Sequence, residues 1–466
     1  MTKLDISYRK IADLRPRSNN PRTHSKKQLE QIATSIQRFG FTNPVLIDAD
    51  GRIIAGHGRV EAGRLIGTTE VPTLCLADMT EADIRAYVIA DNRLAENAGW
   101  DREILGLEFK YLAELDLDLD LAVTGFELAE IDCLIGELSL GEERSDPADE
   151  VPGPAPGPAT TRAGDIWAIG GHRLICGDAT LADTYAALLA GEKAGMIFSD
   201  PPYNVPIQGH VSGLGKAQHR EFAMASGEMS TPEFIEFLTK VFSNLAQVSA
   251  DGAIHFQCMD WRHAGEILAA GDAAYTELKN ICVWAKTNGG MGSLYRSAHE
   301  LVFVFKSGTA PHINNVELGK NGRYRTNVWS YPGANSFSGS REQDLAMHPT
   351  VKPIAMMVDA ILDCSKRKDI VLDAFAGSGS TLLAAQRTGR RGYGVEIDPH
   401  YCDLIVRRLQ ESAKCKAILI GDGRSFDDIA AERSRPAEPA QPIEPTPPVD
   451  PTQPADPIPP VQQEAA

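Results

Sequence analysis

The sequence predicts an α/β protein with a large body at residues 163–430 and a smaller α+β module at residues 1–100. In the large body, short apolar runs of strand length end at polar residues, and apolar positions recur with helical spacing between these runs. A stretch rich in proline, glycine and alanine at residues 141–162 separates the two parts and predicts a stiff, extended linker. A chain of 466 residues is long enough to bury at least two cores.

The composition is that of a soluble globular protein, with 43% hydrophobic and 23% charged residues. No apolar run is long enough to span a membrane, and the N-terminus lacks the apolar region of a signal peptide, so we expect a cytoplasmic protein without a membrane partner. The eight cysteines are scattered without a CxxC pair. We therefore expect reduced thiols, and neither a zinc site nor a disulfide framework.

The net charge of −17 comes from two segments. Residues 101–150 hold 16 acidic and 3 basic side chains, and residues 431–466 hold 6 acidic and 2 basic ones. The rest of the chain is therefore neutral in sum. Because local patches rather than total charge set the affinity for phosphates, this acidity does not exclude DNA as a partner.

The N-terminal module begins with a basic segment at residues 1–38. Ser25 is expected to cap a helix with an apolar stripe, and two apolar runs around an Asp-Gly turn at residues 45–55 predict a hairpin. A second helix is expected to open at the Gly-His-Gly-Arg segment, residues 56–59. Glycines before a helix N-terminus, with arginines nearby, favour an anion site, although a surface turn with solvated arginines is the alternative.

This arrangement resembles the ParB/sulfiredoxin-like module over about residues 5–95, with Asn-Pro-Arg at residues 20–22 and the Gly-His-Gly-Arg segment at the signature places. In ParB relatives the glycine-and-arginine segment binds nucleotide phosphates. The resemblance therefore implies a nucleotide site formed by Arg22, Gly56, His57, Gly58 and Arg59. ParB proteins usually continue into a helix-turn-helix. Here a helix at residues 80–97 and an acidic helical extension at residues 101–140 follow, which argues against sequence-specific DNA reading by this module.

The large body carries the segment Ser-Asp-Pro-Pro-Tyr-Asn at residues 199–204, directly after a short apolar run. Asp200 is expected at the carboxyl end of a buried strand, where open α/β sheets place their ligands. Pro201 and Pro202 prevent helix continuation while their carbonyls remain free to accept hydrogen bonds, and Tyr203 adds an aromatic face. An acid, a free carbonyl and an aromatic ring can together hold a planar ring that carries an amine.

A second strand-to-turn segment lies at residues 369–381. Its glycines allow the backbone to approach a ligand, and the following strand ends in an acid at a spacing suited to ribose hydroxyls. This is the pattern of a Rossmann-like half, although the G-x-G-x-x-G fingerprint of dinucleotide-binding proteins is absent, which argues against an NAD oxidoreductase. The candidate ligand-binding residues here are Asp373, Phe375, Gly377, Gly379 and Glu396.

Between these two segments stands His-Pro-Thr-Val-Lys-Pro at residues 348–353, which leads into a helix with an apolar stripe. The order Asp-Pro-Pro-Tyr, His-Pro-Thr-x-Lys-Pro, Asp-x-Phe-x-Gly-x-Gly and Glu resembles the β group of DNA amino-methyltransferases over nearly all of residues 163–425. The resemblance implies a Rossmann-like S-adenosylmethionine-dependent methyltransferase sheet. It also implies methyl transfer to the exocyclic N6 of adenine in double-stranded DNA, by base flipping and without a metal.

By this resemblance, Asp200 and the Pro201 carbonyl would accept hydrogen bonds from the target amine, and Tyr203 would stack on the flipped base. The implied cofactor residues are Asp373, Gly377 and Gly379 for the amino-acid end, Glu396 for the ribose, Asp178 for the adenine and Lys352 along the pocket. For Asp178 a turn-capping role is the competing interpretation.

Several alternatives stay open at this stage. N4-cytosine methylation needs nearly the same pocket, but Asp200 favours adenine because cytosine enzymes more often carry serine there. A ParB-like nucleotide-responsive regulator with an inactive methyltransferase body is a third hypothesis. Residues 309–346 are interpreted either as a target-recognition region, in which Arg323, Arg325 and Arg341 would contact phosphates and base edges, or as a surface insertion. Residues 431–466 are interpreted as a disordered Pro-rich tail. The sequence leaves open whether the protein forms a homodimer or is paired with a restriction endonuclease.

Overall fold

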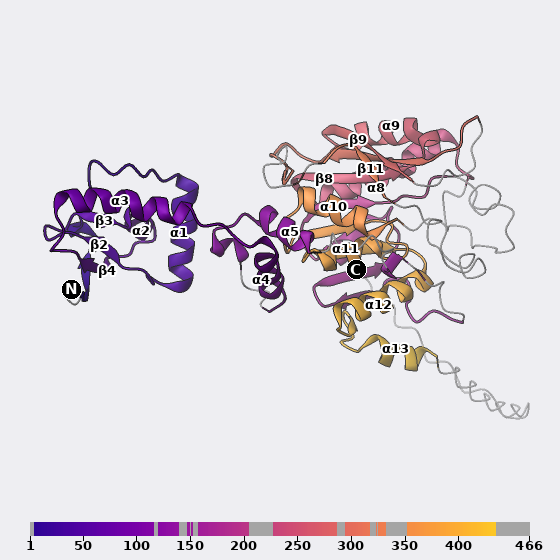
Figure 1. The fold of residues 1–466 in the computed structure, drawn as a ribbon. Coiled ribbons are helices and arrows are strands. Elements are labelled where there is room, and N and C mark those ends of the chain that lie inside the picture. Colours follow the sequence, from indigo (N-terminus) through magenta and orange to yellow (C-terminus); the bar gives the residue numbers. More distant parts are fainter. Residues whose placement is uncertain are drawn as a thin grey trace, which may run out of the picture.

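A computed structural model describes residues 4–115, 120–138, 147–149, 151, 157–204, 227–286, 294–316, 323, 325–331 and 352–434. The N-terminal module and the large body lie at opposite ends of the molecule, and helices α4 (Arg102–Leu115) and α5 (Leu128–Glu137) lie between them (Figure 1). No helix among the described residues is long and apolar enough to cross a membrane. All eight cysteines are free thiols.

The N-terminal module is a four-stranded sheet in the order β1-β4-β2-β3 with helices packed on it. Its elements are β1 (Ile6–Lys10), α1 (Lys26–Phe39), β2 (Val45–Ile47), β3 (Ile53–Ala55), α2 (His57–Leu65), β4 (Glu70–Cys75) and α3 (Glu81–Glu96). The expected hairpin is confirmed, since β2 and β3 pair in antiparallel. The expected cap is also confirmed: the Ser25 hydroxyl accepts a hydrogen bond from the Gln28 N–H at 3.1 Å.

The large body is built on a sheet that, within the described residues, has ten strands in the order β11-β9-β10-β8-β7-β12-β13-β6-β5-β14. The strands are β5 (Ile166–Ile169), β6 (His172–Cys176), β7 (Ala194–Ser199), β8 (Ser249–Met259), β9 (Glu277–Ala285), β10 (His299–Lys306), β11 (Val328–Ser330), β12 (Ile370–Asp373), β13 (Arg391–Glu396) and β14 (Ala417–Leu419). The helices are α6 (Ala182–Leu189), α8 (Thr231–Val248), α9 (Ala264–Ala274), α10 (Ile354–Cys364), α11 (Ser380–Arg387), α12 (Pro399–Ala413) and α13 (Phe426–Arg433).

The two distant motif strands are neighbours at the centre of this sheet. Strands β7 and β12 pair in parallel, with Met196 opposite Val371 and Ile197 opposite Leu372. Immediately beyond them, the Ala374 N–H donates to the Ser199 hydroxyl at 2.9 Å. Both motif strands therefore end at one edge of the sheet, and an open α/β sheet binds ligands at this edge.

Antiparallel strands bring further residues to the same edge. Strand β10 runs antiparallel to both β8 and β9, and Glu300 at its start lies opposite Trp284 near the end of β9. Since β8 runs parallel to β7, the start of β10 and the end of β9 lie at the edge where β7 ends. Side chains from Lys286 and Glu300 can therefore meet those that follow β7.

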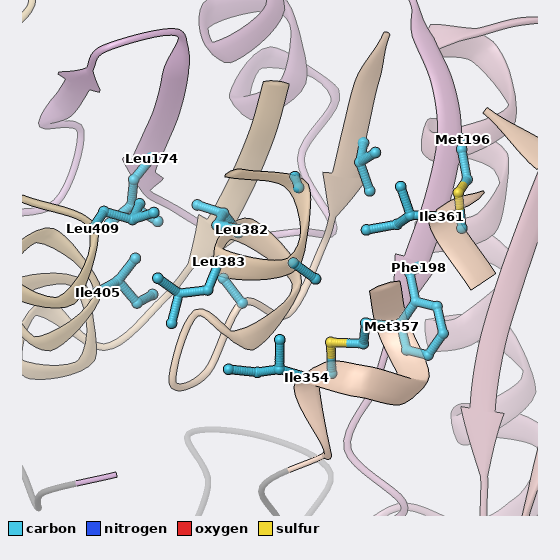
Figure 2. Packing of buried hydrophobic residues seen from close by; sticks show 14 of the residues in the cluster. Leu174, Met196, Phe198, Ile354, Met357, Ile361, Leu382, Leu383, Ile405 and Leu409 are labelled. Atoms are coloured by element: carbon cyan, nitrogen blue, oxygen red, sulfur yellow. The ribbon is translucent and has the colours of Figure 1, made fainter. Parts of the chain in front are cut away.

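Helices α10, α11 and α12 cover one face of the sheet with interlocking apolar side chains (Figure 2). The labelled members of this core are Leu174, Met196, Phe198, Ile354, Met357, Ile361, Leu382, Leu383, Ile405 and Leu409. Full burial of one such side chain contributes about 1.5–3 kcal/mol. Three of them belong to α10, so this packing fixes the helix that follows Lys352 in the chain.

The described part of the 141–162 linker is attached to the large body. Asp149 and Val151 are buried, and the Asp149 carboxylate accepts a hydrogen bond from the Ile354 N–H at 2.9 Å. The Asp403 carboxylate accepts hydrogen bonds from the backbones of Thr160 and Thr161 at 2.6 and 2.8 Å. The linker therefore holds the N-terminal end of α10 in addition to joining the two parts. Residues 435–466 of the expected tail lie outside the described residues.

Candidate active site

Asp200 sits immediately after β7, and both of its carboxylate oxygens have partners. The Tyr203 hydroxyl donates to Oδ1 at 2.6 Å, and the Lys352 ammonium donates to Oδ2 at 2.5 Å. Lys352 Nζ also lies 3.1 Å from the Tyr203 hydroxyl. Pro201 is buried, whereas Pro202 and Tyr203 are half-buried. Three of the residues singled out by sequence (Asp200, Tyr203 and Lys352) therefore form one hydrogen-bonded group.

A second carboxylate belongs to the same group. Glu300 Oε2 lies 3.0 Å from Lys352 Nζ, and Glu300 Oε1 pairs with the Lys286 ammonium. Burial alone would raise the pKa of Glu300, but the two ammonium groups outweigh burial and hold that pKa at about 2. Lys352 is 4% exposed, and burial would lower its pKa, but Asp200 and Glu300 reverse this and raise it. At neutral pH the group therefore holds ionised Glu300 and protonated Lys352.

The glycine-rich turn after β12 is organised by Asp373. Its carboxylate accepts hydrogen bonds from the Thr381 hydroxyl at 2.6 Å and the Phe375 N–H at 3.0 Å. Burial raises the pKa of Asp373 to about 6, and the nearby Asp200 carboxylate adds to the rise. Gly377 and Gly379 have φ values of +50° and +83°, which favour glycine.

Glu396 closes this turn from the end of β13. Its Oε2 accepts a hydrogen bond from the Gly377 N–H at 2.8 Å and its Oε1 one from the Asp398 N–H at 2.9 Å. Burial raises the pKa of Glu396 to about 7. The neighbouring strand β6 leads to Asp178, whose Oδ1 accepts a hydrogen bond from the Thr180 N–H at 2.7 Å. Asp178 thus stands beside Glu396 at this edge and also caps its own turn.

These residues fit S-adenosylmethionine. A Cβ built on Gly377 would meet no atom closer than the Phe375 carbonyl oxygen at 3.9 Å, so space is open above the turn. Glu396 is 9% exposed and receives only backbone N–H groups in the hydrogen bonds described above, which leaves carboxylate lone pairs for ligand hydroxyls. Carboxylates beside a glycine turn suit a ligand with ribose hydroxyls and an amino-acid end.

Three parts of the chain match models of known protein families. Residues 194–407 match the DNA methylase family of the N6/N4 class, residues 2–92 match the ParB N-terminal domain, and residues 103–163 match the ParB-methyltransferase HTH domain. The chain therefore carries a DNA methylase domain of the N6/N4 class together with a ParB-type N-terminal domain. S-adenosylmethionine is the methyl donor of this family.

Individual relatives match either part of the methylase. The ParB-like nuclease domain-containing protein YnaK of Escherichia coli is 49% identical over 17% of this chain and 91% of its own length. The DNA adenine methyltransferase YhdJ of the same organism is 27% identical over 49% of this chain and 80% of its own length. Among solved structures, the PvuII cytosine-N4-specific DNA methyltransferase covers 59% of this chain and 93% of its own, with 14% identity and a TM-score of 0.39.

In the ParB-type domain of the methylase, Gly56 has a φ of +100° and begins α2, as the sequence predicts. Arg59 donates to the Asn43 carbonyl at 2.9 Å, and Arg22 is paired with Glu96 on α3. Burial lowers the pKa of His57, and nearby His24 and Arg17 add to this. The buried His57 Nε2 and Arg17 Nε have no hydrogen-bond partner among the described residues, and Gly58 lies against the His24 ring.

The 309–346 region lies only partly within the described residues, and Tyr324 and Arg341 fall outside them. Arg323 and Arg325, which the sequence suggested as phosphate contacts, are both paired with Asp359 and Asp363 on α10. Their charge is therefore compensated within the protein. These ion pairs tie this part of the methylase to the helix that follows Lys352.

Sequence reasoning missed Glu300 and Lys286 in the methylase site, and it did not recognise residues 103–163 as an HTH match. The available signal for Glu300 was a charged residue at the start of an otherwise apolar strand. Charged strand ends are common at the surface, so this signal becomes informative only once β10 is placed beside β8. The acidity of the 101–140 extension concealed the HTH match.

Proposed function

We propose that the methylase transfers a methyl group to the exocyclic N6 of adenine in double-stranded DNA. The observation that carries this proposal is an aspartate, Asp200, at the end of the central strand β7, beside the carbonyl of Pro201 and next to the glycine turn after β12. The adenine N6 amine is a poor nucleophile because its lone pair is delocalised into the ring. An enzyme for this reaction therefore needs acceptors for both amino hydrogens.

Asp200 and the Pro201 carbonyl are suited to this task because they follow each other at the end of one strand. Acceptance of both amino hydrogens favours a tetrahedral nitrogen, whose lone pair then points away from the ring. Tyr203 and Lys352 hold the Asp200 carboxylate through hydrogen bonds of 2.6 and 2.5 Å. The acceptor is thus oriented before the substrate arrives, and such preorganisation lowers the barrier.

S-adenosylmethionine, when bound, supplies the electrophilic methyl group. Asp373 and the turn at Gly377 and Gly379 would hold its amino-acid end, Glu396 the ribose hydroxyls and Asp178 the adenine. Phe375 stands in the same turn, with its ring 6.2 Å from that of Phe237. Lys352 contacts Asp200 and Tyr203, so we assign it to the amine side of the site rather than to the cofactor pocket.

The target base has to leave the duplex to reach Asp200, at a cost of roughly a few kcal/mol. The Tyr203 ring offers a face for the flipped base while its hydroxyl stays bound to Asp200. Target readout is assigned to the region between β10 and α10. Arg323 and Arg325 would act there by anchoring the segment rather than by contacting phosphates, because Asp359 and Asp363 already pair with them.

The deciding experiment incubates the purified full-length protein with unmethylated double-stranded DNA and S-adenosylmethionine and identifies methylated nucleosides by mass spectrometry. N6-methyladenine is the expected product. Detection of N4-methylcytosine would mean that cytosine, and not adenine, is the target base. Absence of both methylated nucleosides would refute methylation and favour a regulator with an inactive methyltransferase body. Asp200→Ala should abolish transfer while S-adenosylhomocysteine still binds within a few-fold of wild type; equal loss of binding would make Asp200 structural.

We also propose a nucleotide-phosphate site in the N-terminal domain. The supporting observation is that two buried nitrogens, His57 Nε2 and Arg17 Nε, have no hydrogen-bond partner in the described part of the chain, while Arg17 Nη2 pairs with Asp48 and Glu81; His57 directly follows the turn at Gly56 that opens α2. Calorimetric titration of the full chain with nucleoside triphosphates should detect binding that Arg59→Ala weakens. Unchanged binding in that variant would place the nucleotide elsewhere.

A further inference from the structure

The geometry points to Glu300 as a positioning residue of the catalytic centre: it receives the Lys352 ammonium when the Asp200 carboxylate engages the target amine. This inference rests on the proposed function and extends it, since no motif includes Glu300. The consequence is that Asp200 changes partners without leaving a buried cation uncompensated.

The Lys352 ammonium group contacts both carboxylates. An ammonium group has three N–H donors, and Lys352 Nζ has three acceptors within 3.1 Å: Asp200 Oδ2 at 2.5 Å, Glu300 Oε2 at 3.0 Å and the Tyr203 hydroxyl at 3.1 Å. Glu300 is therefore already in reach, and a small rotation of the ammonium group is enough to shift its strongest contact from one carboxylate to the other.

The charges around Lys352 are balanced. Asp200 and Glu300 contribute two negative charges, and Lys352 and Lys286 contribute two positive ones. The Trp284 ring lies beside both ammonium groups, with its centroid 4.5 Å from Lys286 Nζ and 5.9 Å from Lys352 Nζ. The group is thus neutral and largely buried, with Lys352 the most buried member, and removal of one carboxylate would leave a surplus positive charge in it.

The proposed reaction changes the contacts and the charge of Asp200. Asp200 Oδ1 already accepts from Tyr203 and Oδ2 from Lys352, so the target amine shares this carboxylate with Lys352 and weakens its contact with the ammonium group. If Asp200 also takes the proton that the methylated nitrogen releases, its own charge disappears. Without Glu300, Lys352, which is 4% exposed, would then be a buried cation that lacks a counterion, and such a state is strongly unfavourable. Glu300 supplies the counterion both when Asp200 binds the amine and when Asp200 becomes protonated.

The test is a double-mutant cycle on the full-length protein with Glu300→Gln and Lys352→Met, measured as single-turnover methylation of DNA. Glu300→Gln alone should lower the rate about 10- to 100-fold, as expected for loss of a buried charged partner. The affinity for S-adenosylhomocysteine should stay within about twofold, because Glu300 acts on the amine side. In the Lys352→Met background, Glu300→Gln should lower the methylation rate by a further factor of less than about two, because the ammonium group that Glu300 contacts is absent.

Two further variants separate positioning from folding. Glu300→Asp keeps the charge and should recover most of the lost rate. Glu277→Gln removes an exposed glutamate at the other end of the β9–β10 ladder and should have no effect. Equal losses from Glu300→Gln in both backgrounds, or an equal loss of S-adenosylhomocysteine binding, would overturn the inference and leave the proposed function standing. An inactive wild-type protein would overturn both.

Discussion

Asp132 on α5 offers the sharpest test of how the N-terminal part is joined to the catalytic body. Its carboxylate binds two guanidinium groups of the body: Arg390 Nη2 at 2.9 Å and Arg367 Nη2 at 3.0 Å. The side chains of Asp132 and Arg390 are 3% and 0% exposed. Asp132→Ala would therefore leave a fully buried guanidinium without its carboxylate.

The magnitude follows from the remaining partners of Arg390. Removal of one member of a buried ion pair costs about 3–5 kcal/mol. Arg390 keeps acceptors on Ser365, with Oγ at 3.1 Å and the carbonyl at 2.8 Å, and on the Thr388 carbonyl at 2.7 Å. We therefore expect the lower end, about 3 kcal/mol, which corresponds to a fall of roughly 6–12 °C in the melting temperature of the catalytic body.

The assay is thermal unfolding followed by tryptophan fluorescence, since Trp167, Trp284 and Trp329 are buried in the catalytic body. Glu108→Ala is the matched control, because Glu108 is an exposed acid on the adjacent helix α4. Its melting temperature should stay within about 1–2 °C of wild type. Equal melting temperatures for Asp132→Ala and Glu108→Ala would refute the view that α5 is held by this buried pair.

Three further outcomes are expected. Removal of residues 1–98 should preserve methyl transfer because α4, α5 and Asp132 remain. Removal of residues 1–140 should lower the melting temperature as Asp132→Ala does. Equal melting temperatures of the two truncated proteins would contradict this expectation. Burial raises the pKa of Glu396 to about 7, and the ionised carboxylate accepts ribose hydroxyls more strongly than the protonated group. Calorimetry should therefore find S-adenosylhomocysteine binding strengthening from pH 6 to 8, and Glu396→Gln should flatten this dependence. Asp149→Ala removes the acceptor of the Ile354 N–H at the start of α10, so it should destabilise the body by about 1–2 kcal/mol in urea unfolding and slow methyl transfer, and an unchanged rate would mean that Lys352 is held without it.

The sequence alone determined the parts of this protein that depend on short-range patterns. Apolar runs ending in Asp200, Asp373 and Glu396 identified strands and their polar ends, and the helix cap at Ser25 followed from the local preference for a hydroxyl. Because the carboxyl ends of parallel strands meet at one edge, the convergence of the two motifs could also be expected, and the pairing of β7 with β12 confirms it.

Only the tertiary structure decided how the charged side chains pair. Lys352 meets Asp200 across 152 positions of sequence, and Glu300 joins them because β10 runs antiparallel beside β8. Asp132 meets Arg390 across 258 positions, because α5 lies beside the body (Figure 1). A charged residue carries no local signal of its distant partner, since an exposed charge and a buried ion pair look the same in the sequence. Burial and strand order decide between them, and both are properties of the folded chain.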